Sequence, residues 1–346
     1  MNLKLMFSSR AILLLLASVV ALTSCAEIQK EVPLQFVPEQ VVPDKVSVNI
    51  LSGRDGHNGP VLVVKIDDTR SARPQIGIEF ADVVYIEQVE GGLTRLAAVF
   101  SSRMPQRIGP VRSARISDID ILSQFGRVGF AFSGAQRKLL PVIRAANLQD
   151  LGAQRLGPTI YTTDPNRRQP YAMVLRADLV LAKIVEKGYE VDSAKNIGFT
   201  FGAEPTGGVA TEKVELNWPA ATYSANWSPV EGRWLLTHNN VINTAESGVI
   251  LGPTTLVVQM VAITASEYGD KFGGVTPFSQ TVGTGKAYVL RNGQRFAGTW
   301  SRPIASSGTI FRSSDGTQIN FAPGQIWVAL LDREPIFTSS PEPTTK

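Results

Sequence analysis

The stretch from Gly77 to Asp120 reads GIEFADVVYIEQVEGGLTRLAAVFSSRMPQRIGPVRSARISDID and organises the rest of the chain. It contains an apolar run at residues 82–86, a Gly91-Gly92 pair and a second apolar run at residues 93–100. Both runs are short and rich in β-branched or aromatic residues, and the paired glycines between them favour a tight turn. We therefore predict two strands joined by a turn rather than a helix.

Charged side chains gather at the ends of these predicted strands. Glu87 and Glu90 close the first strand, and Arg95 lies inside the second. A Gly-Pro turn then leads to Arg112 and Arg115, just before a helix-like segment. Each charge alone is consistent with a solvated turn residue or a helix cap. As a group they indicate a candidate site, because loops at strand ends and before helices often carry sites on a rigid scaffold.

The first residues have the pattern of a bacterial lipoprotein export signal. Lys4 and Arg10 precede an apolar core at residues 11–22, which is too short to span a membrane comfortably. Small residues then lead to Cys25, the single cysteine of the chain, which therefore has no partner for an internal disulfide. We predict a signal peptide at residues 1–24 and lipidation of Cys25, for example with palmitate. The alternative is a plain exported protein with a chance thiol.

Residues 25–45 form a proline-spaced segment with too little apolar mass for a core. We predict that this segment tethers the folded part to the cell membrane, on its extracytoplasmic face. Several acyl chains on Cys25 would hold the protein firmly there, because each buried methylene contributes roughly 0.8 kcal/mol.

Composition excludes several classes of function. The chain has 346 residues with 34 Lys and Arg against 30 Asp and Glu, and removing Lys4 and Arg10 with the signal leaves 32 against 30. This balance argues against a nucleic-acid-binding protein, which needs a basic face for phosphate contacts. His57 and His238 alone are too few ligands for a zinc site, and no phosphate-binding glycine loop of the nucleotide type is present. We predict no metal and no cofactor.

Strand-like and helix-like segments alternate in the first part of the folded chain. The strand-like runs are residues 60–66 and 128–132, and the helix-like segments are residues 117–125, 139–146 and 177–187. This alternation is typical of a mixed α/β sheet. We place an N-terminal α/β domain at residues 46–200, and its strand ends would gather Asp67, Glu87 and Ser133.

The last third of the chain changes character. Its strand-like runs are residues 223–227, 234–236, 256–261, 287–290, 298–300 and 325–330. Asn-Gly and Asp-Gly turns at residues 291–294 and 314–317 are hairpin signals, because both residue pairs tolerate positive φ. We predict a predominantly antiparallel β domain at residues 201–338, an α+β fold class for the whole chain, and a disordered tail at residues 339–346.

Several blocks of this sequence, taken in order, resemble a known family. The blocks are residues 64–67, 72–75, 81–85, 89–95, 109–115, 282–287, 298–300 and 323–327. They are similar to the signature blocks of the YerB-like lipoproteins, which are defined by the domain of unknown function 3048 in an N-terminal and a C-terminal part. The resemblance brings no established activity. The family pattern has a Pro-His-Asn step where this chain reads Pro170-Tyr171-Ala172, so any chemistry of that histidine would be missing here.

The first functional hypothesis is a binding protein of the cell envelope. The candidate ligand-binding residues are Asp67, Arg73, Arg95, Arg112, Ser113 and Arg115. Arginine suits a cell-wall glycan or another anionic wall component, because its planar fork binds carboxylates and phosphates in a bidentate way. The expected partners are the membrane, through the lipid, and a wall glycan or an envelope protein, with no nucleic acid.

Two alternatives stay open at this point. The chain could be a peptidoglycan-cleaving enzyme with Glu87 or Glu90 as the general acid, because glycan cleavage needs a positioned carboxyl group. Residues three apart in a strand point to opposite faces, so these two meet only if the strand ends before Glu90. The chain could also be a non-catalytic partner of cell-wall synthesis proteins, bound through exposed strand edges.

Overall fold

The structure is a computed structural model, which describes residues 47–270 and 273–339. The predicted signal peptide, Cys25 and the tether lie outside the described residues, as do residues 340–346 of the predicted tail. The described residues belong to one compact unit. None of the helices in the part that the structure describes is long and apolar enough to cross a membrane.

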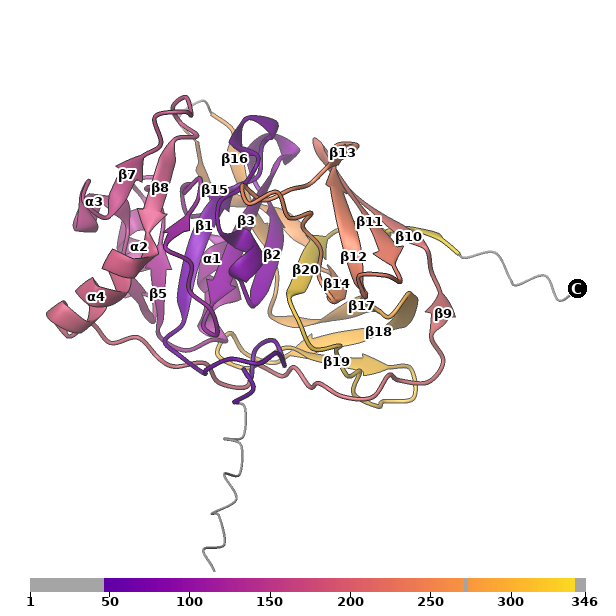
Figure 1. Cartoon of the computed structure of the whole chain (residues 1–346). Helices are drawn as coiled ribbons and strands as arrows, with labels where there is room; N and C mark the ends of the chain where they lie inside the picture. The colour runs from indigo at the N-terminus through magenta and orange to yellow at the C-terminus, as the bar shows by residue number, and fades with distance from the viewer. Residues whose placement is uncertain (1–46, 271–272, 340–346) are drawn as a thin grey trace, which may run out of the picture. The chain divides into compact units, whose positions relative to one another are not determined.

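A large mixed sheet forms the centre of the fold (Figure 1). In spatial order its strands are β19 (Ile310–Ser313), β18 (Gln294–Arg302), β17 (Gly283–Arg291), β14 (Thr255–Met260), β20 (Ile326–Leu331), β2 (Val83–Gln88), β3 (Thr94–Phe100), β1 (Leu62–Asp67), β5 (Val128–Ala131) and β6 (Leu148–Asp150), with β9 (Val209–Ala210) paired to β18. The α+β fold class is confirmed.

Strand β20 lies between strands from the N-terminal part and strands from the C-terminal part of the chain. It runs parallel to β14 on one side and to β2 on the other, so Trp327 aligns with both Leu256 and Val84. All of its residues are buried, which explains its continuous apolar run, as expected for a strand covered on both faces. The large sheet therefore passes through both predicted domains, and the division between residues 200 and 201 stays a prediction.

The predicted pair of strands in the opening stretch is confirmed as β2 and β3. They pair antiparallel, and a short 3₁₀ turn, η3 (Glu90–Gly92), joins them. Gly91 and Gly92 both have positive φ, at 68° and 72°, which glycine adopts without steric cost. A side chain at Gly92 would also collide with Pro219, because an added Cβ would lie 2.4 Å from the Cβ of that proline.

Helices cover both faces of the N-terminal half of the large sheet. The helices are α1 (Ser117–Ser123), α2 (Leu139–Ala145), α3 (Ala153–Leu156) and α4 (Ala177–Lys187). Helices α1 and α2 share an apolar cluster with Val63 and Val99, whereas α4 shares the opposite cluster with Val64 and Ala98. The predicted helices at residues 117–125, 139–146 and 177–187 are thus confirmed, with ends that differ by at most two residues.

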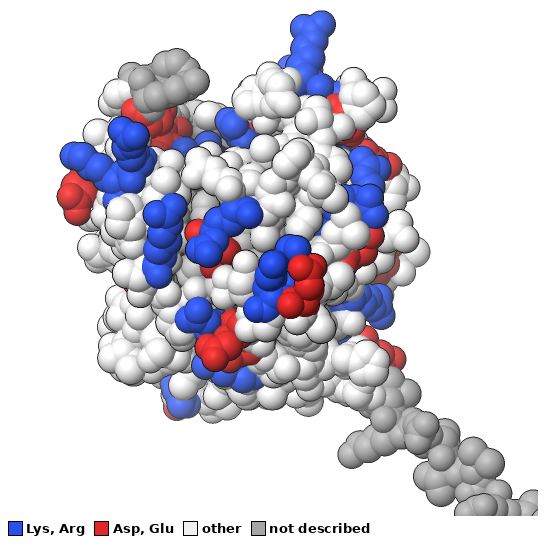
Figure 2. All heavy atoms as spheres, turned by 90° about the vertical axis from the view of Figure 1, so that its left-hand side faces the viewer, with Lys and Arg blue, Asp and Glu red and all other residues white. Residues whose placement is uncertain are grey.

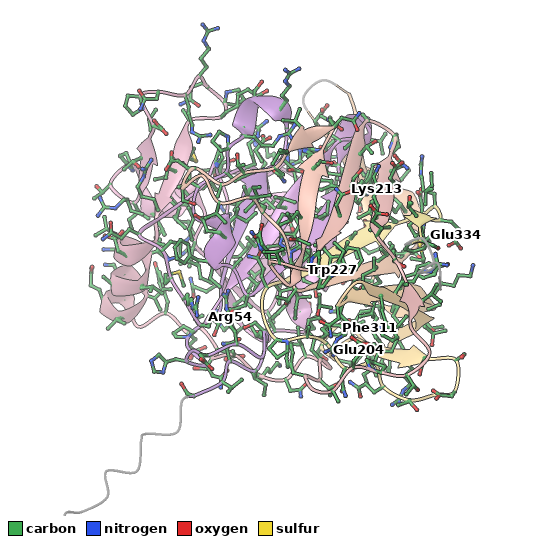
Figure 3. The ribbon with its side chains drawn as sticks, turned by 45° about the vertical axis from the view of Figure 1, so that its right-hand side comes forward. Arg54, Glu204, Lys213, Trp227, Phe311 and Glu334 are labelled. Carbon is green, nitrogen blue, oxygen red and sulfur yellow. The ribbon has the colours of Figure 1, made fainter. Side chains whose placement is uncertain are left out.

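Three smaller sheets and two further 3₁₀ turns complete the fold. They are β13 (Val241–Ile242), β12 (Arg233–His238), β11 (Ala221–Ser228), β10 (Lys213–Trp218) and β21 (Ile336–Thr338) in one sheet, β15 (Ile263–Gly269) and β16 (Val275–Ser279) in a second, β4 (Arg107–Ile108), β8 (Met173–Arg176) and β7 (Tyr161–Thr163) in a third, and the turns η1 (Arg70–Ala72) and η2 (Ile78–Phe80). In Figure 3, Lys213 and Trp227 mark β10 and β11, and Phe311 marks β19.

The five-stranded sheet packs its aromatic side chains against the large sheet. Tyr223 lies 6.3 Å from Trp327 of β20 between ring centroids. Trp218 donates a hydrogen bond from its indole nitrogen to the carbonyl of Leu330, at 3.0 Å. Trp218 and Trp327 are therefore core residues.

Candidate functional site

A pocket of about 620 Å³ opens where strand β1 ends and strand β3 begins. Six of the eight residues that the sequence nominated as site residues line it, namely Asp67, Glu90, Arg95, Arg112, Ser113 and Arg115. Glu87 and Arg73 do not line this pocket. Its size falls within the range of about 300–1,000 Å³ that is typical of small-ligand sites.

The strand register places charged residues in one row across three strands. Arg95 on β3 aligns with Asp67 on β1 and with Glu87 on β2. Residues that align across neighbouring strands point to the same face of a sheet. The row therefore lies on the face that α1 and α2 cover, where β1 and β2 end and β3 begins.

The segment after the Gly-Pro turn adds two more arginines to this row. Its backbone follows the end of β1, because Asp67 donates its N–H to the carbonyl of Pro110 and Arg112 donates its N–H to the carbonyl of Lys65. Further along, Ala114 donates its N–H to the carbonyl of Gly134. These bonds hold the segment between β1 and the loop after β5, so its side chains reach the strand ends.

Two of the arginines are already paired with carboxylates. Arg112 binds Asp67 through its Nε, and Arg115 donates to Oε2 of Glu90 from Nε at 2.9 Å and from Nη2 at 2.7 Å. The hydroxyl of Thr276 donates to the other oxygen of Glu90. Burial raises the pKa of Glu90, but the bonds and charge of Arg115, together with Thr276, more than offset this and hold its pKa below the usual value. Glu90 is therefore a carboxylate at neutral pH.

Arg95 is the arginine of the row that lacks such a pairing. It donates from Nη1 to the carbonyl of Ser113 at 2.9 Å, and it makes no ion pair with a carboxylate of any described residue. Burial, together with the charges of Arg115 and Arg112, lowers the pKa of Arg95 to about 10, although the charges of Asp67 and Glu90 act in the opposite direction. The pocket thus contains a guanidinium whose charge is not compensated by direct contact.

Glu87 lies behind the pocket in a fully buried charge cluster. Lys65 bonds to Glu87 and, at 2.6 Å, to Asp118, and all three side chains have 0% exposure. Asp118 also accepts the backbone N–H of Arg115 at 2.6 Å. Burial and the neighbouring charge of Asp118 raise the pKa of Glu87 to about 7. One cation facing two carboxylates explains this direction, because the cluster is neutral when one carboxyl group keeps its proton.

Arg73 lies outside the pocket that contains Arg95. Its Nη1 donates to the carbonyl of His238 at 3.0 Å, and it lines a second pocket of about 440 Å³ with Arg167, Arg168 and Tyr171. The structure therefore brings Arg73 close to the loop after β8 and does not bring it to the row of Arg95.

A buried polar network connects the strand ends to the five-stranded sheet. The hydroxyl of Tyr223 donates to both oxygens of Asp68, at 2.7 and 2.8 Å, and Thr94 and Gln75 also donate to this carboxylate. Burial raises the pKa of Asp68 to about 7. The ring of His238 stacks on Tyr223 at 4.3 Å, and burial lowers the pKa of His238 to about 3. This network supports Thr94, the neighbour of Arg95 in the pocket.

Sequence reasoning missed the part of the pocket wall that comes from distant segments. Tyr268 and Thr276 reach the pocket from the β15–β16 hairpin, and Arg137 and Tyr171 reach it from two loops. No local motif marks Tyr268, Thr276 or Arg137, because only long-range folding brings them to Arg95, whereas Tyr171 stands at the step where this chain departs from the family pattern.

The surface around this half of the fold carries mixed charge. Figure 2 shows Lys and Arg side chains interspersed with Asp and Glu side chains on the face that lies on the left of Figure 1. Among residues 47–270 and 273–339, no group of three or more His, Cys, Asp or Glu side chains lies close enough to hold a metal ion.

Comparison with known proteins covers most of the chain. Residues 51–190 match the "Protein of unknown function (DUF3048) N-terminal domain", and residues 214–328 match the corresponding C-terminal domain. A Bacillus subtilis (strain 168) protein described as the candidate lipoprotein YerB is 25% identical over 278 residues, which are 79% of this chain and 81% of that protein. A crystal structure of YerB from Bacillus subtilis matches with a TM-score of 0.72 at 19% identity, covering 85% of this chain and 100% of that chain.

Proposed function

The chain belongs to the DUF3048 family of proteins of unknown function, and on that premise we propose that it is a lipid-anchored protein of the bacterial cell envelope that binds an anionic group of a wall polymer beside Arg95. The observation that carries this proposal is the uncompensated guanidinium of Arg95 in the pocket. A buried or half-buried cation normally has an acidic partner, because removing it from water is costly.

The neighbouring ion pairs support a ligand at Arg95 in particular. Asp67 and Glu90 are occupied by Arg112 and Arg115, so neither carboxylate is available to Arg95. A carboxylate or phosphate from a ligand would supply the missing charge. Arginine is suited to it, because the guanidinium presents several donors in a fixed plane that matches both kinds of anion.

The membrane anchor rests on the sequence and on a relative. Cys25 follows a charged start, an apolar core and small residues, and the Bacillus subtilis relative is described as a candidate lipoprotein. Lipidation at Cys25 would keep the pocket close to the membrane, on the side where wall polymers are assembled.

The enzyme hypothesis loses support from the same geometry. Glu87 has 0% exposure and does not line the pocket, so no substrate in the pocket would contact it. Glu90 lines the pocket, but its lowered pKa leaves it without a proton to donate at neutral pH. Neither glutamate therefore combines access to the pocket with a proton to donate at neutral pH.

Binding of the full chain to purified, insoluble cell-wall material tests the proposal. We expect Arg95→Gln to weaken binding by about tenfold or more, because a hydrogen bond to a charged group is worth roughly 1.5–3 kcal/mol. Arg144→Gln is the matched control, since it removes the same charge from an exposed position at the end of α2. Arg95 is a better choice than Arg115, whose loss would leave Glu90 unpaired and destabilise the fold.

Thermal unfolding of the same variants separates lost binding from lost structure. Removing an uncompensated, poorly solvated charge should leave the melting temperature of Arg95→Gln unchanged or slightly raised. Equal binding of wild type and Arg95→Gln would contradict the proposal.

A further inference from the structure

The second pocket adjoins the first one. Tyr171 lines both pockets, and the loop after β1 contributes Thr69 to the first and Ser71 to the second. The guanidinium carbon of Arg112, in the first pocket, lies 5.8 Å from the ring centroid of Tyr171. At this distance the cation interacts with the ring face, so Tyr171 forms a wall that the two pockets share.

One arginine of the second pocket is part of the scaffold. Arg167 pairs with Asp164 at 3.2 Å, and it donates to the carbonyls of Ala72 at 2.9 Å and Pro74 at 2.7 Å. These contacts fix the loop after β7 against the segment after η1. Arg167 has little capacity left for a ligand.

The other two arginines of this pocket make no ion pair with any carboxylate in the described part of the chain. Arg73 donates to the backbone carbonyl of His238, and its Nε is buried without a hydrogen-bond partner among the described residues. Arg168 is exposed at the rim. The second pocket thus repeats the property of the first, where Arg95 is uncompensated.

From this juxtaposition we infer that the two pockets are consecutive subsites for a linear polyanion, with an anionic group of one repeat at Arg95, an anionic group of a neighbouring repeat at Arg168 and Arg73, and Tyr171 between them. The inference rests on the proposed anion binding at Arg95 and specifies the class of ligand. A molecule with a single anionic group would compensate one pocket, whereas a chain with an anion in each repeat would compensate both. Two linked contacts raise affinity without new chemistry, because the second contact forms at a high effective concentration.

The chain length of the ligand provides the test, with the full-length protein in detergent and calorimetric titration. One arm uses sn-glycerol 3-phosphate and poly(glycerol phosphate) oligomers of increasing length. The other arm uses galacturonate and oligogalacturonates, so the two arms distinguish phosphodiester polymers from carboxylated glycans. We expect the oligomers of one arm to bind about tenfold or more tightly than their monomer.

Variants then assign the gain to the second pocket. Arg168→Gln should remove most of the gain with length while the monomer still binds in the pocket of Arg95, and Arg73→Gln provides a second variant of the same pocket. Arg95→Gln should weaken both monomer and oligomers, and the control Arg144→Gln should weaken neither.

The outcomes separate this inference from the proposed function. If the monomer binds as tightly as the oligomers, or if the gain survives both Arg168→Gln and Arg73→Gln, the two-subsite inference is overturned while binding at Arg95 stands. If binding of the monomer is unaffected by Arg95→Gln, or if no member of either arm binds, the proposed function itself fails.

Discussion

Substitution of Glu87 by Gln should change the pH dependence of stability in a defined direction. Burial and the charge of Asp118 raise the pKa of Glu87 from 4.5 to about 7 in the folded protein. Between these two values the folded state holds a proton on Glu87 that the unfolded state has lost. Stability from this group is therefore fully present below pH 4.5 and is lost as the pH rises through 7. The shift corresponds to about 3 kcal/mol, because one pKa unit is worth roughly 1.4 kcal/mol.

Glutamine lacks this titration and resembles the protonated side chain. The free energy of unfolding of Glu87→Gln, measured relative to wild type, should therefore increase by about 2–3 kcal/mol between pH 5 and pH 8. The assay is urea unfolding at several pH values, followed by tryptophan fluorescence. Asp68 and His238 titrate in both proteins, so their contributions cancel in the difference. The exposed Glu212→Gln serves as control and should show no such trend.

A flat difference between wild type and Glu87→Gln over this pH range would refute the reasoning. It would mean that Glu87 is ionised in the folded protein at pH 5, and that Lys65 compensates both carboxylates.

Three further predictions concern the buried networks and the anchor. Lys65→Met should destabilise the protein by about 3–5 kcal/mol, because Glu87 and Asp118 would lose their buried cation. Chemical denaturation measures the free energy of unfolding, and a loss below about 1 kcal/mol would contradict a buried ion pair of Lys65 with these two carboxylates. Tyr223→Phe should lower the free energy of unfolding by about 1.5–3 kcal/mol, because Asp68 loses the hydroxyl that contacts both of its oxygens; Tyr288→Phe, whose hydroxyl bonds to the exposed Glu334, should cost clearly less. Cys25→Ser should release the protein from salt-washed membranes, since a lipid anchor is not screened by ions; a wild-type protein that takes up no fatty-acid label would contradict lipidation.

Local sequence patterns predicted strands β1, β2 and β3, which hold the aligned charges of the site, but not the β15–β16 hairpin that completes the pocket wall. The β2–β3 hairpin follows from short β-branched runs around Gly91 and Gly92, and α4 ends where Gly188 adopts a left-handed conformation. The order of the strands in the sheet could not be predicted from the sequence. Strand β20 inserts beside β2 from the far end of the chain, and no local signal determines which distant strands pair.

The candidate site was predictable in part, for a related reason. Charged residues near strand ends in the sequence did meet in one pocket, because the register of β1, β2 and β3 aligns Asp67, Arg95 and Glu87. Whether such a residue faces the pocket or the core depends on its partners. Glu87 has Lys65 as a buried partner and lies behind the pocket, and this pairing is visible only once the strands are placed.

A crystal structure of the protein with a bound anionic wall fragment tests the central claim most directly. The fragment should be the oligomer that binds more tightly in the calorimetric comparison of phosphodiester and carboxylate chains. We predict a carboxylate or phosphate oxygen within hydrogen-bond distance of the guanidinium of Arg95, in the pocket that also contains Arg112 and Arg115. A fragment bound elsewhere on the protein, with no anionic oxygen near Arg95, would contradict the account.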